Sequence, residues 1–162
     1  MIKFINFILI SFNMNTCIQQ KSKISEYPSN ACIFCKIGNG EIPAYKVYED
    51  KTILAFLDIN PHAQGHTVVI PKKHGVTVFD LNETDQKNIM AAVVKTMRII
   101  QEKLNPGGFN VGWNHATAGG QVVPHLHIHI MPRYNGDGGG SMHSIVKNPG
   151  KKSVEEVAKL LK

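Results

Sequence analysis

Residues 125–133 read HLHIHIMPR, a run in which three histidines alternate with leucine and isoleucine. Successive side chains of an extended strand point to opposite faces. The run therefore predicts a strand with all three imidazole rings on one face and the aliphatic side chains on the other. We expect the aliphatic face to pack against a helix, which leaves the histidine face available for a ligand.

Three alternate imidazoles crowd titratable rings along one side of a strand, which is unfavourable unless the rings bind something. Two ligands fit this arrangement: a metal ion, or a phosphate group that one imidazole attacks while its neighbours stabilise the phosphoryl oxygens. A metal site made of the three histidines would leave Asp58, His66, Asn114 and the turn at residues 119–121 without roles. A phosphate site uses them, because imidazole attacks as a neutral nucleophile near pH 7 and then leaves readily.

Four other runs of strand character precede the histidine run. The five predicted strands cover residues 44–49, 53–58, 66–71, 109–114 and 125–131. The first two strands are joined by Asp50 and Lys51, a connection short enough to favour an antiparallel hairpin.

One long helix is predicted between the third and fourth strands. Asn82 followed by Asp85 signals its start, and residues 106–108, Pro-Gly-Gly, signal its end. Apolar residues recur between these signals at helical spacing and predict a core stripe of Ile89, Val93, Met97, Ile100 and Leu104. Residues 153–156, Ser-Val-Glu-Glu, predict the capping box of a short amphipathic helix. The expected fold class is α+β, with a mainly antiparallel five-stranded sheet, one long helix and a short C-terminal helix.

The chain has 162 residues and 43% hydrophobic content, which suits one compact domain. Its formal charge of +6 lies mainly at the two ends, because residues 31–146 carry ten Lys and Arg against nine Asp and Glu. We therefore predict solvated tails and no dedicated nucleic-acid surface. The expected organisation is an N-terminal extension over residues 1–30, a domain over residues 31–140 and a C-terminal tail over residues 141–162.

The N-terminal residues 1–13, MIKFINFILISFN, contain one short apolar run. It falls below the roughly 20 residues that span a bilayer, so we predict no transmembrane segment. No small-residue cleavage pattern follows it, which makes it a weak signal peptide. Three cysteines are too sparse and uneven for a secreted disulfide framework. We expect a cytoplasmic protein, with export through this weak signal as the alternative.

The histidine run also resembles a family motif. Residues 125–131, preceded by Gly120-Gln121 and followed by Pro132-Arg133, are similar to the defining motif of the histidine triad (HIT) family of nucleotide hydrolases and transferases. Upstream segments resemble the Hint-like bacterial branch of that family: CIFCKI (32–37), EIP (41–43), VYED (47–50), AFLD (55–58) and GHTVVIPKKH (65–74). The resemblance covers about residues 31–140.

The resemblance implies a HIT-like fold and an enzyme that acts at the α-phosphate of purine nucleotide conjugates, either nucleoside phosphoramidates or dinucleoside polyphosphates. The middle histidine is the nucleophile in that family. His127 is therefore expected to form a nucleotidyl-histidine intermediate that water cleaves. The resemblance places His129 and His66 against the phosphate. It also implies a homodimer and no organic cofactor.

The resemblance further assigns contacts with the substrate. Asn114 is expected near the scissile phosphate and Asp58 at the ribose hydroxyls. Phe56 and Ile59 are expected against the base. Gln121, of the glycine-glutamine pair, is expected beside the phosphate.

Val122 departs from the family pattern, because many Hint-like members have Ser or Thr at this position to assist the leaving group. A valine side chain cannot donate a hydrogen bond. Protonation of the leaving group then falls to His129, a water or the Gln121 amide. This departure keeps open a second function, a non-catalytic nucleotide-binding or protein-interaction module with vestigial activity. A third possibility is a metalloenzyme that uses the three histidines as ligands.

Cys32 and Cys35 form a CxxC pair at the start of the expected domain. Such a pair is either a redox couple or half of a zinc site. Zinc-bearing members of the family complete the site with two histidines, whose positions here are His74 and His125. A closed set of two cysteines and two histidines makes zinc structural, so we expect the metal to support the fold and not to catalyse the reaction.

Overall fold

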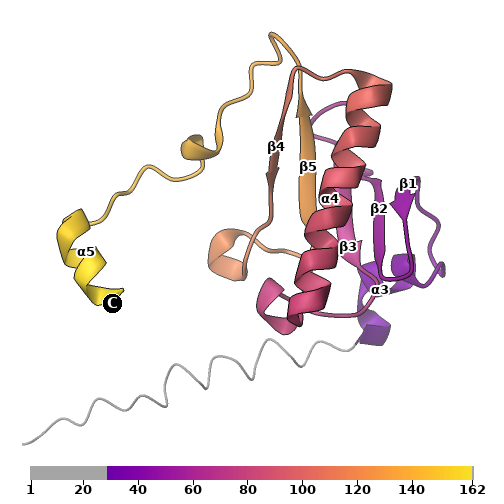
Figure 1. Ribbon diagram of the computed structural model, residues 1–162, viewed down its shortest axis with the longest axis horizontal. Coiled ribbons are helices and arrows are strands. Elements are labelled where there is room, and N and C mark those ends of the chain that lie inside the picture. Colours follow the sequence, from indigo (N-terminus) through magenta and orange to yellow (C-terminus); the bar gives the residue numbers. More distant parts are fainter. Residues whose placement is uncertain (1–28, 162) are drawn as a thin grey trace, which may run out of the picture.

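The computed structural model describes residues 29–161 and is organised around a five-stranded antiparallel sheet (Figure 1). The strands are β1 (Lys46–Glu49), β2 (Ile53–Leu57), β3 (Thr67–Pro71), β4 (Gly108–Gly112) and β5 (Ile128–Arg133). Their spatial order is β1-β2-β3-β5-β4, so β5 lies between β3 and β4. The predicted antiparallel sheet is thereby confirmed.

The expectations for the N-terminal extension fall mainly on residues 1–28, which lie outside the described part of the chain. Within residues 29–161, no helix combines the length and apolar character needed to cross a bilayer.

The strand of the histidine run begins later than the alternation predicts. Pairing in β5 starts with Ile128 opposite Val69, whereas the pattern places the strand over residues 125–131. The preceding backbone is held by the loop after β3, because the N–H of Leu126 donates to the carbonyl of Gly75 at 2.7 Å. The first two histidines therefore lie in a segment that leads into the sheet, with His125 at a bend.

Helix α4 (Glu83–Leu104) covers one face of the sheet (Figure 1). It begins as predicted, with the Asn82 side chain accepting the N–H of Asp85 at 2.8 Å. It ends where Asn105 adopts a left-handed conformation with φ 47°, directly before a proline. Both boundaries therefore follow from local sequence signals.

The core lies between α4 and the aliphatic residues of the histidine run, as predicted. Its members include Ile89, Ala92, Val93, Ile100, Leu126, Ile128 and Ile130. The predicted stripe is longer than the observed one, because Leu104 is 37% exposed at the last turn of the helix.

Helix α3 (Ile33–Gly38) lies on the opposite face of the sheet and covers a second, smaller core. That core contains Ile37, Leu54, Phe56, Val68 and Ile70. The sequence does not predict α3, because six residues are too few to establish a helical period. The histidines share this face with α3, since His129 is the cross-strand partner of Val68.

The remaining elements are short. Four 3-10 turns cover Ser29–Ala31 (η1), Val78–Asp80 (η2), Thr117–Gly119 (η3) and Met142–Ser144 (η4). Helix α5 (Val154–Leu160) begins with the predicted capping box, in which Ser153 and Glu156 satisfy each other's backbone N–H groups. It stands apart from the sheet at the end of an extended tail (Figure 1), and its apolar side chains are exposed.

Candidate active site

The three histidines of the run have different surroundings although they share one face. His125 is completely buried, His127 is 7% exposed and His129 is partly exposed. The ring centroids of His127 and His129 are 5.1 Å apart, closer than the roughly 7 Å between alternate residues of a strand. These two rings therefore lean toward each other, and together they can contact one small group.

A short hydrogen bond fixes the ring of His127. Its Nδ1 lies 2.7 Å from the carbonyl oxygen of His125. Because a carbonyl can only accept, Nδ1 carries a hydrogen, and in a neutral ring Nε2 then keeps its lone pair. Phe34 from α3 packs against the edge of the same ring, with 5.2 Å between the centroids. His127 is thus held in one orientation with Nε2 able to act as a nucleophile or as a proton acceptor.

A chain of hydrogen bonds connects His62, His66 and His129. The backbone N–H of His62 donates to Nδ1 of His66 at 3.3 Å, so a neutral His66 ring carries its hydrogen on Nε2. That Nε2 lies 3.0 Å from Nδ1 of His129 and donates to it. A neutral His129 ring therefore carries its hydrogen on Nε2, where it can serve as a donor.

Burial keeps the rings of His66 and His129 neutral. Loss of solvent lowers the pKa of His66, and the Asp58 carboxylate, 3.8 Å from its Nδ1, offsets this only in part. Burial, followed by repulsion from His127 and His66, lowers the pKa of His129 to about 4. Both rings are therefore uncharged at neutral pH, as the hydrogen-bond chain requires.

An apolar pocket of about 360 Å³ opens beside His127 and His129, and we call it the His127 pocket. Its walls include Phe34, Phe56 and Ile59, and Asp58 contributes a carboxylate. Apolar walls with a few polar groups are typical of small-molecule sites. Five residues singled out from the sequence therefore line one pocket: Phe56, Asp58, Ile59, His127 and His129.

Asn114, Gln121 and Val122 lie in the loop after β4. Asn114 is exposed, and its amide nitrogen donates to the Gly120 carbonyl at 3.3 Å. Val122 is 89% exposed. Gln121 is half-buried, and its amide contacts backbone groups of the protein. The loop thus presents Asn114 and Val122 to solvent, whereas the Gln121 side chain points into the protein.

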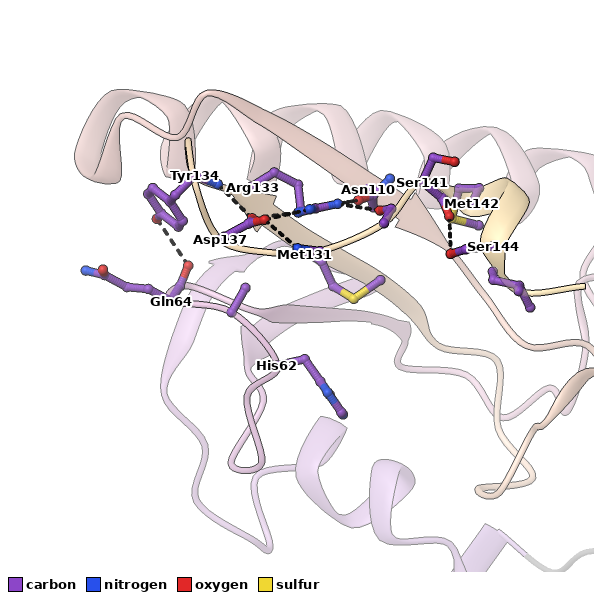
Figure 2. A pocket seen from close by; sticks show the side chains of 14 residues that line it. His62, Gln64, Asn110, Met131, Arg133, Tyr134, Asp137, Ser141, Met142 and Ser144 are labelled. Carbon is purple, nitrogen blue, oxygen red and sulfur yellow. Dashed lines mark hydrogen bonds and ion pairs between the residues drawn. The ribbon is translucent and has the colours of Figure 1, made fainter.

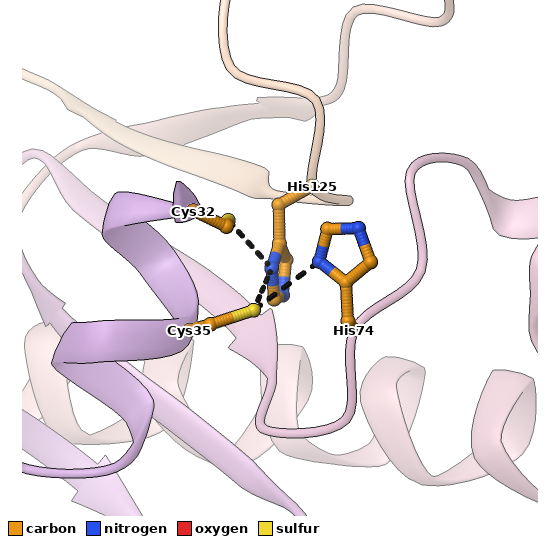
Figure 3. A group of neighbouring side chains, drawn as sticks. All are labelled: Cys32, Cys35, His74 and His125. Carbon is orange, nitrogen blue, oxygen red and sulfur yellow. Dashed lines mark hydrogen bonds between the residues drawn. The ribbon is translucent and has the colours of Figure 1, made fainter. Parts of the chain in front are cut away.

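Four expected metal ligands converge into a cluster of Cys32, Cys35, His74 and His125 (Figure 3). One potential ligand atom from each residue lies within 4.8 Å of the others. Sγ of Cys35 lies 3.2 Å from Nδ1 of His74 and 3.5 Å from Nδ1 of His125. Sγ of Cys32 lies 3.4 Å from the same His125 nitrogen. The cluster is therefore a candidate metal-binding site.

Neighbouring groups orient this cluster toward a cation. Nε2 of His125 donates to the carbonyl of Pro71 at 2.8 Å, so its Nδ1 lone pair faces the sulfur atoms. Burial, reinforced by the neighbouring Cys32, raises the pKa of the Cys35 thiol to about 12. A thiolate at Cys35 is therefore favourable only when a positive charge lies beside it.

A second pocket of about 370 Å³ lies on the sheet face that carries the histidines, toward β4 (Figure 2). Arg133 lines it, and its guanidinium forms two 2.7 Å bonds with the Asp137 carboxylate. This pairing holds the pKa of Asp137 well below its usual range and neutralises the arginine. Met142 covers Gly112, the cross-strand partner of His129, so this pocket borders the histidine face.

Sequence reasoning missed two residues of the site. Phe34 contacts His127 and lines the His127 pocket, but it lies on the helix that the sequence does not predict. The sequence signal for this contact was the pair of apolar residues between Cys32 and Cys35. His62 contributes a backbone N–H, which no side-chain pattern reveals.

Comparison with known proteins agrees with this geometry. Residues 39–136 match the family model described as the HIT domain. The chain is 47% identical over 131 residues to an uncharacterized HIT-like protein of Methanocaldococcus jannaschii, covering 81% of this chain and 98% of that protein. It is 40% identical over 105 residues to a Schizosaccharomyces pombe adenosine 5'-monophosphoramidase, covering 65% and 76%. A crystal structure of a HIT family protein from Bacillus anthracis aligns with a TM-score of 0.73 at 38% identity, covering 83% and 94% of the chains. The chain belongs to the HIT family.

Proposed function

We propose that this protein hydrolyses or transfers nucleotides at the α-phosphate of purine nucleotide conjugates through a covalent intermediate on His127. The observation that carries the proposal is the 2.7 Å hydrogen bond from His127 Nδ1 to the His125 carbonyl. In the neutral ring it places the free lone pair on Nε2 of a residue that lines a pocket of suitable size for a nucleoside. The name of the fission yeast relative, adenosine 5'-monophosphoramidase, supports the same chemistry.

In the first step, Nε2 of His127 attacks the α-phosphorus and forms a P–N bond. The bond from phosphorus to the leaving amine or phosphate breaks, and the leaving group departs with the electron pair. The imidazole is now cationic, and the His125 carbonyl stabilises it by accepting the Nδ1–H. Neutral His129 donates a hydrogen bond from Nε2 to the phosphoryl group, and a leaving amine takes its proton from water.

In the second step, water attacks the same phosphorus and releases its proton to bulk solvent. The P–N bond then breaks and returns neutral His127, because imidazole is a good leaving group. His66 takes no direct part in bond breaking. Its 3.0 Å bond to His129 keeps the His129 hydrogen on Nε2 during both steps.

The nucleoside would occupy the apolar pocket beside these rings. Phe56 and Ile59 supply apolar contacts for the base, and the Asp58 carboxylate accepts hydrogen bonds from ribose hydroxyls. Asn114 is exposed on the loop after β4, and we assign its amide to a phosphoryl oxygen of the substrate. Asp58 also lies close enough to His66 to influence its charge.

We further propose that Cys32, Cys35, His74 and His125 hold a structural zinc ion. Tetrahedral zinc with Zn–S of about 2.3 Å and Zn–N of about 2.0 Å separates its sulfur and nitrogen ligands by about 3.5 Å. The observed sulfur to nitrogen distances of 3.2, 3.4 and 3.5 Å fit that geometry. The metal would bind the α3 segment to the start of the histidine run, which fixes the backbone ahead of His127.

We also propose a homodimer in a reducing compartment such as the cytoplasm. Strand β4 lies at the edge of the sheet, where its outer backbone groups can pair with a second copy. Met90 and Val94 of α4 are about half exposed, at 48% and 47%, and would extend such an interface. Sedimentation of the full chain tests this arrangement, and a monomer mass at micromolar concentration would overturn it.

A direct experiment tests the proposed reaction. The purified protein is incubated with adenosine phosphoramidate and, separately, with diadenosine tetraphosphate, quenched early and analysed by mass spectrometry. We expect a nucleotidyl adduct on His127 and turnover of at least one substrate. His127→Ala should abolish both while retaining nucleotide binding.

The exposed Val122 favours a second candidate, a nucleotide-binding module with vestigial activity, because the position lacks a hydroxyl to assist the leaving group. Under that alternative, nucleotide binds with the same affinity to the parent and to His127→Ala. Neither protein then forms an adduct. The same experiment therefore separates the two functions.

A further inference from the structure

Gln121 lies at the junction of three backbone segments that surround the histidine run. Its amide oxygen accepts the N–H of Ala116 at 2.9 Å. Its amide nitrogen donates to the carbonyls of Val76 at 2.7 Å and Val123 at 3.1 Å, and lies 3.5 Å from the His125 carbonyl. The nitrogen has only two hydrogens, so both are used by backbone carbonyls of the protein.

The sheet does not hold the backbone around the nucleophile. His127 lies one residue before the first paired residue of β5. Other bonds replace the missing ladder: Leu126 donates to the loop after β3 at 2.7 Å, and His125 donates to the Val123 carbonyl at 2.8 Å. The same Val123 carbonyl accepts the Gln121 amide. Gln121 therefore anchors the segment whose His125 carbonyl fixes the His127 ring.

Gln121 also closes the strained turn that follows Asn114. Ala116 has φ 57° and ψ 178°, a conformation that residues with a side chain rarely adopt. Gln121 binds Ala116 twice, through its side-chain oxygen at 2.9 Å and through its own backbone N–H, which donates to the Ala116 carbonyl at 3.0 Å. Loss of the side chain would release one of these two bonds and loosen the turn.

We propose that Gln121 is a positioning residue that orients His127 through the backbone of residues 123–125 and does not contact the substrate. This differs from the direct contact expected for Gln121 from the family resemblance. The inference rests on the proposed nucleophilic role of His127. In physical terms, Gln121 holds the His125 carbonyl in the position where it accepts the Nδ1–H of His127.

The test compares Gln121→Met with a matched control, Gln86→Met. Gln86 likewise donates from its amide to two backbone carbonyls, those of Val78 at 3.2 Å and Leu81 at 3.0 Å, but at the start of α4. Three quantities are measured for each full-length protein: kcat and KM for adenosine phosphoramidate, and the tautomer of His127. The tautomer is read from ¹⁵N–¹H correlation spectra, assigned by comparison with His127→Ala.

We expect kcat to fall about 10- to 100-fold in Gln121→Met, with KM within about twofold of the parent, because a small displacement of a nucleophile has effects of this size. We expect the parent to show the Nδ1–H tautomer of His127 and Gln121→Met to show a mixture. Gln86→Met should match the parent in all three measurements. If Gln121→Met does not fold, Gln121→Glu replaces it, since a carboxylate still accepts from Ala116 but cannot donate to Val76.

Two results would overturn the inference. A raised KM with unchanged kcat and tautomer would show that Gln121 contacts the substrate. A Gln121 variant that behaves like Gln86→Met in every measurement would show that it only stabilises its loop. If the parent neither turns over substrate nor forms an adduct, the proposed function fails, whereas the tautomer comparison still decides the role of Gln121.

Discussion

The cysteine-histidine cluster and the His127 pocket both use histidines of one short run, but one region is closed and the other is open. In the cluster, His125 is completely buried, and both of its ring nitrogens face protein groups, the Pro71 carbonyl and the cysteine sulfurs. In the pocket, His127 has one nitrogen on a backbone carbonyl while its ring lines a cavity of about 360 Å³. A histidine whose two ring nitrogens both face protein groups has a structural role, whereas one with a nitrogen free to face a cavity can take part in chemistry. The surroundings of the ring therefore decide its role.

The two regions are joined by a single peptide segment. His125 contributes its ring to the cluster and its carbonyl oxygen to the Nδ1–H of His127. Phe34 forms a second connection, because it lies on α3 between the two cysteines and its ring packs against both His125 and His127. The closed region is therefore a rigid support for the open one, and changes in either region test this division.

The largest effect is expected from opening the closed region. Cys35→Ser removes a ligand that contacts both histidines of the cluster. We expect loss of bound zinc and a decrease in the free energy of unfolding on the order of 4 kcal/mol, because a tightly bound metal stabilises the folded state by mass action. Metal content by mass spectrometry and urea unfolding measure these two quantities.

His143→Ala provides the control for the metal prediction, since His143 is an exposed histidine outside the cluster. It should retain full metal content and stability. Zinc that stays bound to Cys35→Ser at the parent stoichiometry would contradict the proposed ligand set.

A smaller effect is expected at the wall of the open region. Asp58→Asn removes the charge that we assign to the ribose hydroxyls. We expect KM for an adenosine phosphoramidate to rise about tenfold, which corresponds to roughly 1.4 kcal/mol of lost binding. The KM of the matching 2',3'-dideoxy substrate should not change, because it lacks the groups that Asp58 would bind. Equal effects on both substrates would remove Asp58 from the ribose site.

Acidification should weaken the open region through His129. Its pKa is lowered to about 4 in the folded protein, from an ordinary value of 6.5. Between these values the unfolded state binds more protons, so the contribution of neutral His129 to stability is present above pH 6.5 and is lost as pH falls toward 4. The slope stays below about 1.4 kcal/mol per pH unit, because a single histidine exchanges at most one proton.

Thermal unfolding of the parent and of His129→Gln at pH 7.5, 5.5 and 4.5 measures this contribution. We expect the variant to lose less stability than the parent over this range. The surface variant His143→Gln should follow the parent. Parallel curves for the parent and His129→Gln would mean that His129 does not titrate with a lowered pKa.

The smallest effect is expected at Val122, on the exposed loop. Val122→Ser places a hydroxyl donor where the family resemblance leads us to expect one. We expect turnover to increase by a few fold for a phosphoramidate with a strongly basic amine, which needs a proton to leave, and little change for a weakly basic one. Val122→Ala is the control for size, and an equal gain in both variants would exclude hydrogen bonding as the cause.

Local sequence patterns predicted most elements of the fold. Helix α4 begins at the cap residue Asn82 and ends at the residues after Leu104. Both boundaries come from signals that act within a few residues. Alternation in the histidine run correctly separated the aliphatic face from the histidine face. Alternation failed at the start of β5, because pairing depends on a neighbouring strand, and residues 125–127 face the loop after β3 instead.

The candidate site was predictable where side-chain identity alone was informative. Cys32, Cys35, His74 and His125 were expected together, and the structure brings them together. Phe34 was missed because α3 is short, and its contact with His127 depends on how α3 packs against the sheet. The hydrogen bonds of the Gln121 amide to the backbone could not be predicted either, since its partners are backbone groups up to 45 residues away.

The sequence by itself determined which residue types are available: an alternating histidine strand, a cysteine pair and the ends of a long helix. These features are local, because they follow from side-chain periodicity and from the chemistry of neighbouring residues. Only the tertiary structure decided what each histidine does. The position of the hydrogen on each imidazole depends on the carbonyl, N–H or sulfur that faces it, and those partners come from other parts of the chain, such as Pro71 beside His125 and His66 beside His129.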